Sequence, residues 1–405
     1  MLDDFGQRIR DIILSEMDLS RELSDEEICD LIGSVVSREA RDRPMTIKDR
    51  AELERTIFNS LRKLDVLQEL VDDRDVTEIM VNGPNDIFYE KAGRIQRFNG
   101  HFSSEEKLED VIQQIVGRHN RVVNQASPIV DTRLSDGSRV NIVLNPISIG
   151  GSAVSIRKFP EHPMSMERLV EIEALSPEVA RLLQILTQAK YNIFISGGTG
   201  SGKTTFLNAL SQYIPDDERI ITIEDSAELQ LLGAKNIVRL ETRNANTDGV
   251  TPITIRDLIR TALRMRPDRI IVGECRGAEA LDMLQAMNTG HDGSLSTGHA
   301  NSPHDIISRI ETMVLQGQDF PLNAIRQQIA SGIDIIVQLG RLRDKSRRVL
   351  EISEVDGFMG GEIVLHTLYR FEETAVLDSG RIQGFLKKAG TLCHTDKLMA
   401  AGLSV

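Results

Sequence analysis

The fold of this chain is decided by the stretch Ser196-Gly197-Gly198-Thr199-Gly200-Ser201-Gly202-Lys203-Thr204-Thr205. The stretch fits the pattern G-x-x-x-x-G-K-[ST], in which glycines let the backbone fold tightly around a phosphate with its N–H groups pointing inward. We expect Lys203 to lie against the β- and γ-phosphates of a nucleotide and the Thr204 hydroxyl to hold Mg²⁺. All residues from Gly197 to Thr205 are therefore candidate binding residues for a nucleoside triphosphate.

The segments on either side of this stretch favour a phosphate loop over a chance match in a glycine-rich turn. The apolar run Tyr191-Asn192-Ile193-Phe194-Ile195 is typical of a buried strand. The run Phe206-Leu207-Asn208-Ala209-Leu210 is typical of a helix. The N-terminus of such a helix favours anions through its dipole and its free N–H groups. The sequence thus predicts a strand, a phosphate loop and a helix in succession.

Length, charge and cysteine content limit the classes of protein that fit. A chain of 405 residues is expected to hold about two or three domains. The net charge of −13 argues against broad binding to nucleic acid or anionic lipid. The cysteines Cys29, Cys275 and Cys393 lie far apart, which favours a reduced, cytosolic setting. The acidic first residues do not resemble a signal peptide, and no apolar run of about 20 residues predicts a membrane span.

The patterning predicts three parts. Residues 1–65 are expected to form a short helical lead-in, with a capping box of Ser24 and Glu27. Residues 66–160 alternate short strands and one amphipathic helix, as in a small α+β domain, which ends at a Pro-bearing hinge, Phe159 to Pro163. Residues 161–405 alternate helices and strands as in an α/β sheet, and past about Val337 we expect short strands and turns.

Two apolar strands of the third part end in carboxylates, Ile220 to Asp225 and Arg269 to Glu274. Ligands of parallel sheets lie beyond the carboxyl ends of the strands, so both ends belong near the phosphates. Glu274 is placed to bind Mg²⁺ directly or through a water molecule. The candidate bases that orient water are Glu224, Asp225 and Glu228, and the alternative is a solvated loop.

Histidine and arginine residues add further candidates. His299 is either a phosphate-side residue or a hydrogen-bonded structural histidine. Each arginine of the expected site can stabilise transition-state charge, and the alternative for any one of them is a surface ion pair. As a group they suggest that the second and third parts meet at a phosphate; they are Arg133, Arg139, Arg157, Arg243, Arg264, Arg266 and Arg276.

Several boxes, in this order, resemble those of the type II/type IV secretion ATPase superfamily. They are a Walker A box at Gly197 to Thr204, an Asp box at Thr222 to Leu229, a Walker B box at Arg266 to Gly277, and His-box segments at Asn288 to His291 and Gly298 to Ser302. The sequence is most similar to those of the CpaF-type ATPases of Tad/Flp pilus assembly at Val130 to Asn141, Ser155 to Phe159 and Leu284 to Ser294. The resemblance runs from about residue 66 to about residue 355.

This resemblance implies a RecA-like P-loop NTPase domain that follows the α+β domain. It implies a cytoplasmic, Mg²⁺-dependent ATPase that forms a homo-hexameric ring and docks on an inner-membrane platform. The ring would be peripheral to the membrane through its partners and would couple ATP hydrolysis to pilus assembly or secretion. Separately, the net charge of −13 leads us to expect no direct binding of nucleic acid.

By position in the family's boxes, Glu228 is implied to be the general base and Glu274 the carboxylate on the Mg²⁺ side. His299 is implied to contact the γ-phosphate region, and Lys203 the phosphates. The arginines Arg133, Arg139 and Arg157 are implied to complete the site across a domain or subunit boundary. One departure is Gly298, because the family more often has a bulky aliphatic residue before the histidine.

Three alternatives to the pilus motor remain open. One is a type IV secretion ATPase that moves protein or DNA, and another is a RecA-like nucleic-acid translocase, which the net charge of −13 disfavours. The third is a nucleotide-binding scaffold that does not hydrolyse, which the presence of Lys203, Thr204, Glu228 and Glu274 disfavours.

Overall fold

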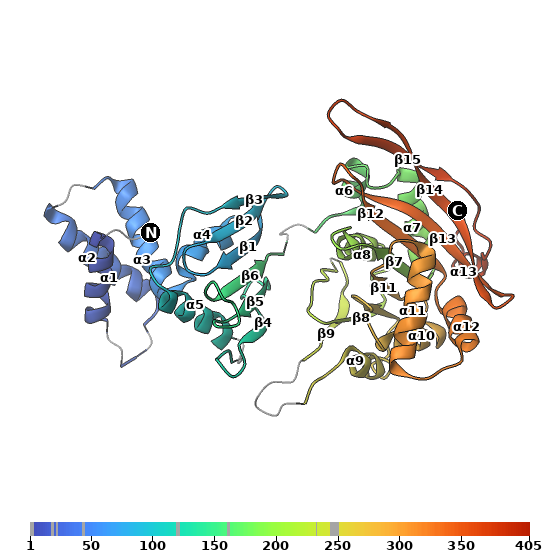
Figure 1. The fold of residues 1–405 in the computed structure, drawn as a ribbon, viewed down its shortest axis with the longest axis horizontal. Coiled ribbons are helices and arrows are strands. Elements are labelled where there is room, and N and C mark those ends of the chain that lie inside the picture. The colour runs from blue at the N-terminus through green and yellow to red at the C-terminus, as the bar shows by residue number, and fades with distance from the viewer. Residues whose placement is uncertain are drawn as a thin grey trace. The chain divides into compact units, whose positions relative to one another are not determined.

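The computed structural model describes residues 4–17, 20–21, 23–42, 45–118, 122–159, 163–231, 233–243 and 251–405. The chain divides into two compact units, Met1–Glu161 and His162–Val405 (Figure 1). The hinge expected at Phe159 to Pro163 spans this division, and its residues 160–162 lie outside the described residues. Among the described residues, no helix combines the length and the apolar character that crossing a bilayer requires.

The first unit begins with helices α1 (Asp4–Glu16), α2 (Asp25–Glu39) and α3 (Ile47–Arg62), with the short turn η1 (Ala40–Asp42) after α2. The capping box predicted at Ser24 and Glu27 is confirmed, and a second one joins Thr46 to Asp49 at the start of α3. These reciprocal bonds satisfy N–H groups that a helix start leaves without partners. The helices bury a small aliphatic core of their own: Ile9, Ile13, Ile28, Ile32, Val35, Val36 and Ile57.

The rest of the first unit is an antiparallel sheet with helices. Its elements are η2 (Asp65–Leu67), α4 (Gln68–Asp72), β1 (Val76–Asn82), β2 (Ile87–Lys91), β3 (Arg94–Arg97), α5 (Glu105–Gly117), β4 (Ile129–Arg133), β5 (Arg139–Val143) and β6 (Ala153–Arg157). The strand order is β3-β2-β1-β6-β5-β4. Helix α5 also holds α3: Lys107 donates to the carbonyl of Ser60 at 2.9 Å, and Gln114 donates to the carbonyl of Arg62 at 3.1 Å. The helical lead-in and the sheet therefore belong to one compact unit.

The second unit is built on a sheet of order β15-β14-β13-β12-β7-β11-β10-β8-β9. Its first six elements after the hinge are α6 (Met166–Glu171), α7 (Pro177–Gln188), β7 (Ile193–Gly197), α8 (Lys203–Ser211), β8 (Arg219–Glu224) and β9 (Asn236–Glu241). They are followed by α9 (Ile255–Ala262), β10 (Arg269–Val272), α10 (Glu279–Asn288), β11 (Leu295–Gly298), α11 (Pro303–Gly317), α12 (Leu322–Gly332) and β12 (Ile335–Arg341). Strands β9, β8, β10, β11, β7 and β12 pair in parallel.

Helices cover both faces of this sheet (Figure 1). One core lies between the sheet and helices α6, α7 and α8, and the other lies between the sheet and helices α9 to α12. Strand β7 is buried along its whole length because it lies in the middle of the sheet. This is the α/β architecture that the sequence predicts.

The expectation of short strands and turns past Val337 is wrong. The sheet continues in long antiparallel strands, β13 (Arg347–Met359), β14 (Glu362–Val376) and β15 (Ile382–Lys388). Register shifts interrupt their pairing, for example between Ile352 and Ser353. Each shift breaks the alternation of apolar and polar residues, so a long strand has the sequence pattern of several short ones.

The last helix, α13 (Asp396–Ala401), and the segment before it are fastened to the sheet. The buried carboxylate of Glu354 accepts hydrogen bonds from the backbone N–H groups of Cys393 and His394, at 2.7 and 2.8 Å. The Tyr191 hydroxyl, just before β7, donates to the carbonyl of His394 at 2.6 Å. Lys397 donates to Asp334, which also accepts from the backbone N–H of Asn192. Residues 393–397 therefore close the core around the amino end of β7.

Candidate active site

Parallel pairing brings the chemistry-bearing segments of the second unit to one edge of the sheet. Along β7, Ser196 pairs with Gly298 of β11, and Gly197 pairs with Leu339 of β12. Farther along the sheet, Val272 at the end of β10 pairs with Ile223, one residue before the end of β8. The residues that follow these positions therefore emerge at the same level, as the sequence predicts for Glu224 and Glu274, and His299 after β11 joins them.

The phosphate loop leaves β7 and enters α8 directly. Gly200 and Gly202 have φ values of +71° and +93°, which favour glycine, and Gly202 is the N-cap of α8. At Gly197 a Cβ atom would lie 2.5 Å from the Ser201 Oγ and 2.7 Å from the Leu339 carbonyl oxygen, so only glycine fits. Thr204 and Thr205 stand half-buried in the first turn of α8. The loop is therefore a tight cradle at a helix N-terminus, which suits a phosphate chain.

Lys203 lies inside this cradle and is 8% exposed. Its ammonium group donates to the carbonyls of Gly197 and Gly198, at 3.0 and 3.1 Å. It also lies 3.1 Å from Nδ1 of His299. Two loop carbonyls and His299 therefore fix the position of this cation.

A chain of polar contacts continues from Lys203 through three further side chains. His299 Nε2 lies 2.7 Å from a carboxylate oxygen of Glu274, and the other oxygen of Glu274 lies 2.5 Å from the Arg276 guanidinium. The hydrogen bond to Glu274 is the largest cause that raises the pKa of Arg276. The negative charges of Glu274, Asp225 and Glu228 raise this pKa further. Arg276 therefore lies within the electrostatic reach of the carboxylates that follow β8 as well as of Glu274 after β10.

The surroundings of His299 determine whether its ring is neutral or protonated. Burial is the main cause that lowers the pKa of His299, and the nearby Lys203 lowers it further against the opposite effect of Glu274. Burial also lowers the pKa of Lys203. Because the lysine ammonium has only donors, Nδ1 of His299 must accept, so the proton of the neutral ring resides on Nε2 and faces Glu274.

Glu224 and Glu228 occupy different environments. Glu224 is buried, and one of its carboxylate oxygens accepts from the backbone N–H groups of Glu228 and Leu229, at 2.8 and 3.0 Å. A Cβ atom at Gly273 would lie 2.8 Å from the Cγ of Glu224, so glycine there makes room for this side chain. Glu224 therefore holds the loop after β8 in shape. Glu228 is half-buried on that loop and Asp225 is exposed.

Thr204 and Glu274 remain the candidates for Mg²⁺. Among the described residues there is no cluster of three or more His, Cys, Asp or Glu side chains that could hold a metal ion by itself. A hydroxyl and a carboxylate are the hard oxygen ligands that Mg²⁺ takes when nucleotide phosphates and water supply the rest. The donor set thus fits a metal that arrives with its nucleotide.

Sequence reasoning missed two residues that shape this edge. Gln338 of β12 is buried and donates from Nε2 to the carbonyl of Ala300, at 3.2 Å, which fixes the loop that carries His299. Arg347 donates to the phosphate loop from β13. No motif marks either residue, because each lies far along the chain from the loop it contacts. The structure also explains the departure at Gly298: a Cβ atom there would lie 2.9 Å from the Phe194 ring and 3.0 Å from Ile306.

The structure aligns the candidate arginines of the first unit in one row. Arg133 at the end of β4 pairs with Arg139 at the start of β5, and Arg139 pairs with Arg157 at the end of β6. Directly paired residues of neighbouring strands project from the same face of a sheet. The row therefore presents several cations side by side on one face of the first unit.

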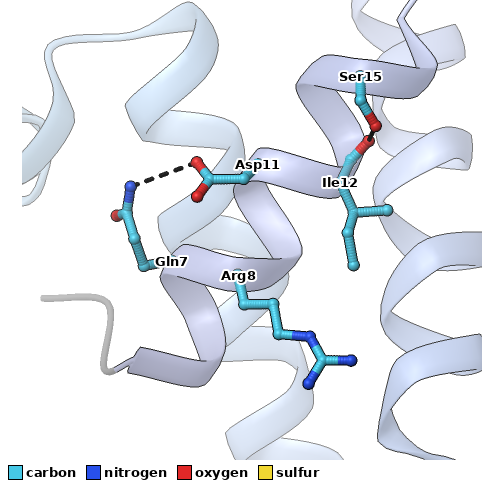
Figure 2. Close-up of a pocket in the computed structure, with 5 residues that line it drawn as sticks. All are labelled: Gln7, Arg8, Asp11, Ile12 and Ser15. Atoms are coloured by element: carbon cyan, nitrogen blue, oxygen red, sulfur yellow. Dashed lines mark hydrogen bonds between the residues drawn. The ribbon is translucent and has the colours of Figure 1, made fainter.

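A hollow on α1 is a separate feature of the first unit (Figure 2). Its polar groups bond within the helical part: Gln7 donates to Asp11 at 3.5 Å, the Ser15 hydroxyl donates to the carbonyl of Ile12 at 2.7 Å, and Arg8 pairs with Glu39 at 3.4 Å. All lining residues come from one helix. A ligand site usually gathers polar groups from several elements, so this hollow is not a candidate active site.

The strand order, the phosphate loop and the charged edge define a RecA-like P-loop unit that follows a smaller α+β domain. The chain belongs to the family "Type II/IV secretion system protein", whose model matches residues 60–382. It is 33% identical over 306 residues to a protein of Mycobacterium tuberculosis named "Putative conjugal transfer protein", with 74% of this chain and 86% of that protein covered. It is 33% identical over 320 residues to the type IV secretion system protein PtlH of Bordetella pertussis, with 73% of this chain and 94% of that protein covered.

Solved structures share the fold at lower identity. The pilus retraction motor PilT, solved with bound ADP, has a TM-score of 0.54 and 22% identity, covering 81% of this chain and 83% of that chain. The Legionella pneumophila ATPase DotB has a TM-score of 0.54 and 22% identity, covering 73% and 80% of the two chains. These likenesses confirm the predicted fold class.

The different environments of Glu224 and Glu228 predict different variants. Glu224→Ala should lower the free energy of unfolding by about 1–3 kcal/mol, because two backbone N–H groups lose a buried acceptor. Glu228→Gln should melt like the wild type and bind nucleotide, but hydrolyse it slowly, because an amide cannot accept a proton from water. Thermal melts, nucleotide titrations and phosphate release measure these effects. If Glu228→Gln hydrolyses normally while Glu224→Gln is folded but inactive, the general base is Glu224 and not Glu228.

The neutral form of His299 predicts a dependence of stability on pH. Its pKa is lowered in the folded state, so the unfolded chain takes up this proton first as the pH falls through about 6.5. The stability due to the neutral ring is therefore present above this pH and is lost as the pH falls through the folded pKa. The melting temperature of the wild type should fall more steeply between about pH 7.5 and 5.5 than that of His299→Gln. Parallel curves for the two proteins would contradict this.

Proposed function

We propose that this chain is an Mg²⁺-dependent ATPase that powers the assembly of a pilus or the transport of a secreted substrate. The chain of contacts from Lys203 through His299 to Glu274 carries this proposal. It joins the phosphate loop to the residues that follow β11 and β10, so a γ-phosphate bound beside Lys203 would change the charge that acts on His299 and Glu274. Membership of the type II/IV secretion system family supports the same function.

Each residue has a role that follows from its position. The N–H groups of the loop from Gly197 to Thr205 and the Lys203 ammonium bind the phosphates and stabilise the charge that develops during phosphoryl transfer. Thr204 and Glu274 would hold Mg²⁺, which would neutralise phosphate charge. Glu228 orients and deprotonates the attacking water, and Glu224 keeps its loop in place. His299 reports on the γ-phosphate through Lys203 and Glu274.

The finer assignment is a CpaF-type ATPase of Tad/Flp pilus assembly. It rests on the sequence resemblance of the segments Val130 to Asn141, Ser155 to Phe159 and Leu284 to Ser294 to that group. In this proposal residues 1–65 are a lead-in, 66–160 an N-terminal domain and 161–405 the ATPase domain. Six copies form a ring on the cytoplasmic side of an inner-membrane platform, and Arg133, Arg139 and Arg157 complete a nucleotide site across a domain or subunit boundary.

The relatives favour a second candidate, a type IV secretion ATPase that moves protein or DNA. PtlH is named as a type IV secretion system protein, and TrbB of Rhizobium radiobacter, 31% identical over 332 residues, as a conjugal transfer protein. Phosphate release with and without added DNA tests for a DNA substrate, and stimulation by DNA would favour the second candidate or a translocase. Copurification with pilin or a pilus platform protein would favour the first.

The proposal predicts that Lys203→Ala abolishes hydrolysis with the fold intact. Removing a fixed cation from the phosphates should lower the rate of phosphate release by about 100-fold or more. The measurement is phosphate release by a variant whose circular dichroism matches the wild type. A rate within about threefold of the wild type, about 0.6 kcal/mol in activation free energy, would overturn the assignment of the site.

A shared site predicts that specific activity rises with protein concentration, because a lone subunit lacks its neighbour's arginine. Arg139→Ala should lower turnover more than nucleotide affinity, and mixing it with Lys203→Ala subunits should restore part of the activity. Arg94→Ala, at the opposite edge of the same sheet, is the matched control for loss of charge. Activity titrations beside light scattering with an ATP analogue measure both effects. A fully active monomer with constant specific activity would exclude the ring.

A further inference from the structure

Arg347, the first residue of β13, contacts the phosphate loop from outside. Its Nε donates to the carbonyl of Gly200 at 2.9 Å. A Cβ atom built on Gly202 would lie 3.5 Å from the Arg347 Cδ, so the side chain also lies along the next glycine. Gly200 and Arg347 are 147 residues apart in the sequence and both are exposed.

The geometry of a phosphate loop explains why this contact matters. Its N–H groups point inward to bind phosphate, so its carbonyls take other partners, either side chains or water. Lys203 satisfies the carbonyls of Gly197 and Gly198 at the start of the loop. Arg347 binds the carbonyl of Gly200, whose φ of +71° glycine adopts at little steric cost but at a cost in conformational entropy.

The segment that carries Arg347 is itself well anchored. Arg347 pairs in register with Arg341 at the end of β12. The turn between them is held by Asp344, which accepts from the N–H groups of Ser346 and Ile382, at 2.9 and 2.8 Å. The next residue, Arg348, is buried and donates to the carbonyls of Glu173 and Ile382. The guanidinium of Arg347 therefore reaches the loop from a fixed base.

We propose that Arg347 is a positioning residue of the nucleotide site, which holds the Gly200 carbonyl outward and so keeps the loop in its phosphate-binding form. The ligand class is a nucleoside di- or triphosphate, so this inference rests on the proposed function. The guanidinium also adds a positive charge beside the loop, which favours a polyphosphate. Its effect is on affinity, because the contact is made to the loop rather than to reacting atoms.

The test compares three full-length variants with the wild type: Arg347→Ala, Arg347→Lys and Arg341→Ala. Arg341→Ala is the matched control, because it removes the same charge from the paired position of the same hairpin. Arg347→Ala should raise the Kd for a fluorescent ATP analogue and the KM for ATP by about three- to tenfold, while kcat stays within about twofold. Arg347→Lys should recover most of the affinity, because lysine can still donate to a carbonyl.

The outcomes separate this inference from the proposed function. Equal Kd values for Arg347→Ala and Arg341→Ala would overturn the role of Arg347. A lower melting temperature in Arg347→Ala, together with an Arg347→Lys variant that does not recover affinity, would also overturn it. If the wild type itself neither binds the analogue nor releases phosphate, the proposed function fails. If the wild type binds and hydrolyses ATP and Arg347→Ala has the same Kd and KM as the wild type, the proposed function stands and only this inference is wrong.

Discussion

The parallel pairing of β7 with β11 on one side and β12 on the other is the constraint on which the site depends. It fixes the phosphate loop, the loop of His299 and the end of β12 at one level of the sheet. A slip of one residue would turn every side chain of a strand to the opposite face. Aliphatic residues such as Ile193, Ile195 and Val337 secure the register, because each is fully buried against helices. The chemistry at the edge is thus positioned by apolar packing behind it.

Alternating charge explains how a buried lysine is tolerated in this loop. Burial disfavours the ammonium of Lys203, and the Glu274 carboxylate, together with two carbonyls, offsets part of that cost. Glu274 in turn meets His299 and Arg276. Neighbouring groups in such a chain polarise one another, so a change of charge at one end alters the whole arrangement. A change of charge beside Lys203 would therefore act on Glu274 and Arg276 through His299.

Local chemistry made part of this protein predictable from its sequence. The phosphate loop needs glycines at fixed positions, and its flanking strand and helix follow from a few apolar residues. Parallel sheets gather strand ends, so Glu224 and Glu274 could be placed at one edge without coordinates, whereas His299 was expected there only from the resemblance of the His-box segments. The bracing role of Glu224 was not predictable, because it depends on two N–H groups in a loop whose shape has no sequence signature. The contacts of Gln338 and Arg347 join segments far apart in the chain, and register shifts hide the length of β13 and β14 from the sequence pattern.

The fastening of residues 393–397 has a consequence for how the unit is made. Tyr191 and Asn192 precede the phosphate loop, yet their partners are His394 and, through Asp334, Lys397. During synthesis the ribosome releases β7 long before it releases those partners. The second unit can therefore form most of its sheet cotranslationally, but the amino end of its central strand closes only after residues 393–397 have left the exit tunnel. Nascent chains halted before this segment would expose the base of β7 to chaperones.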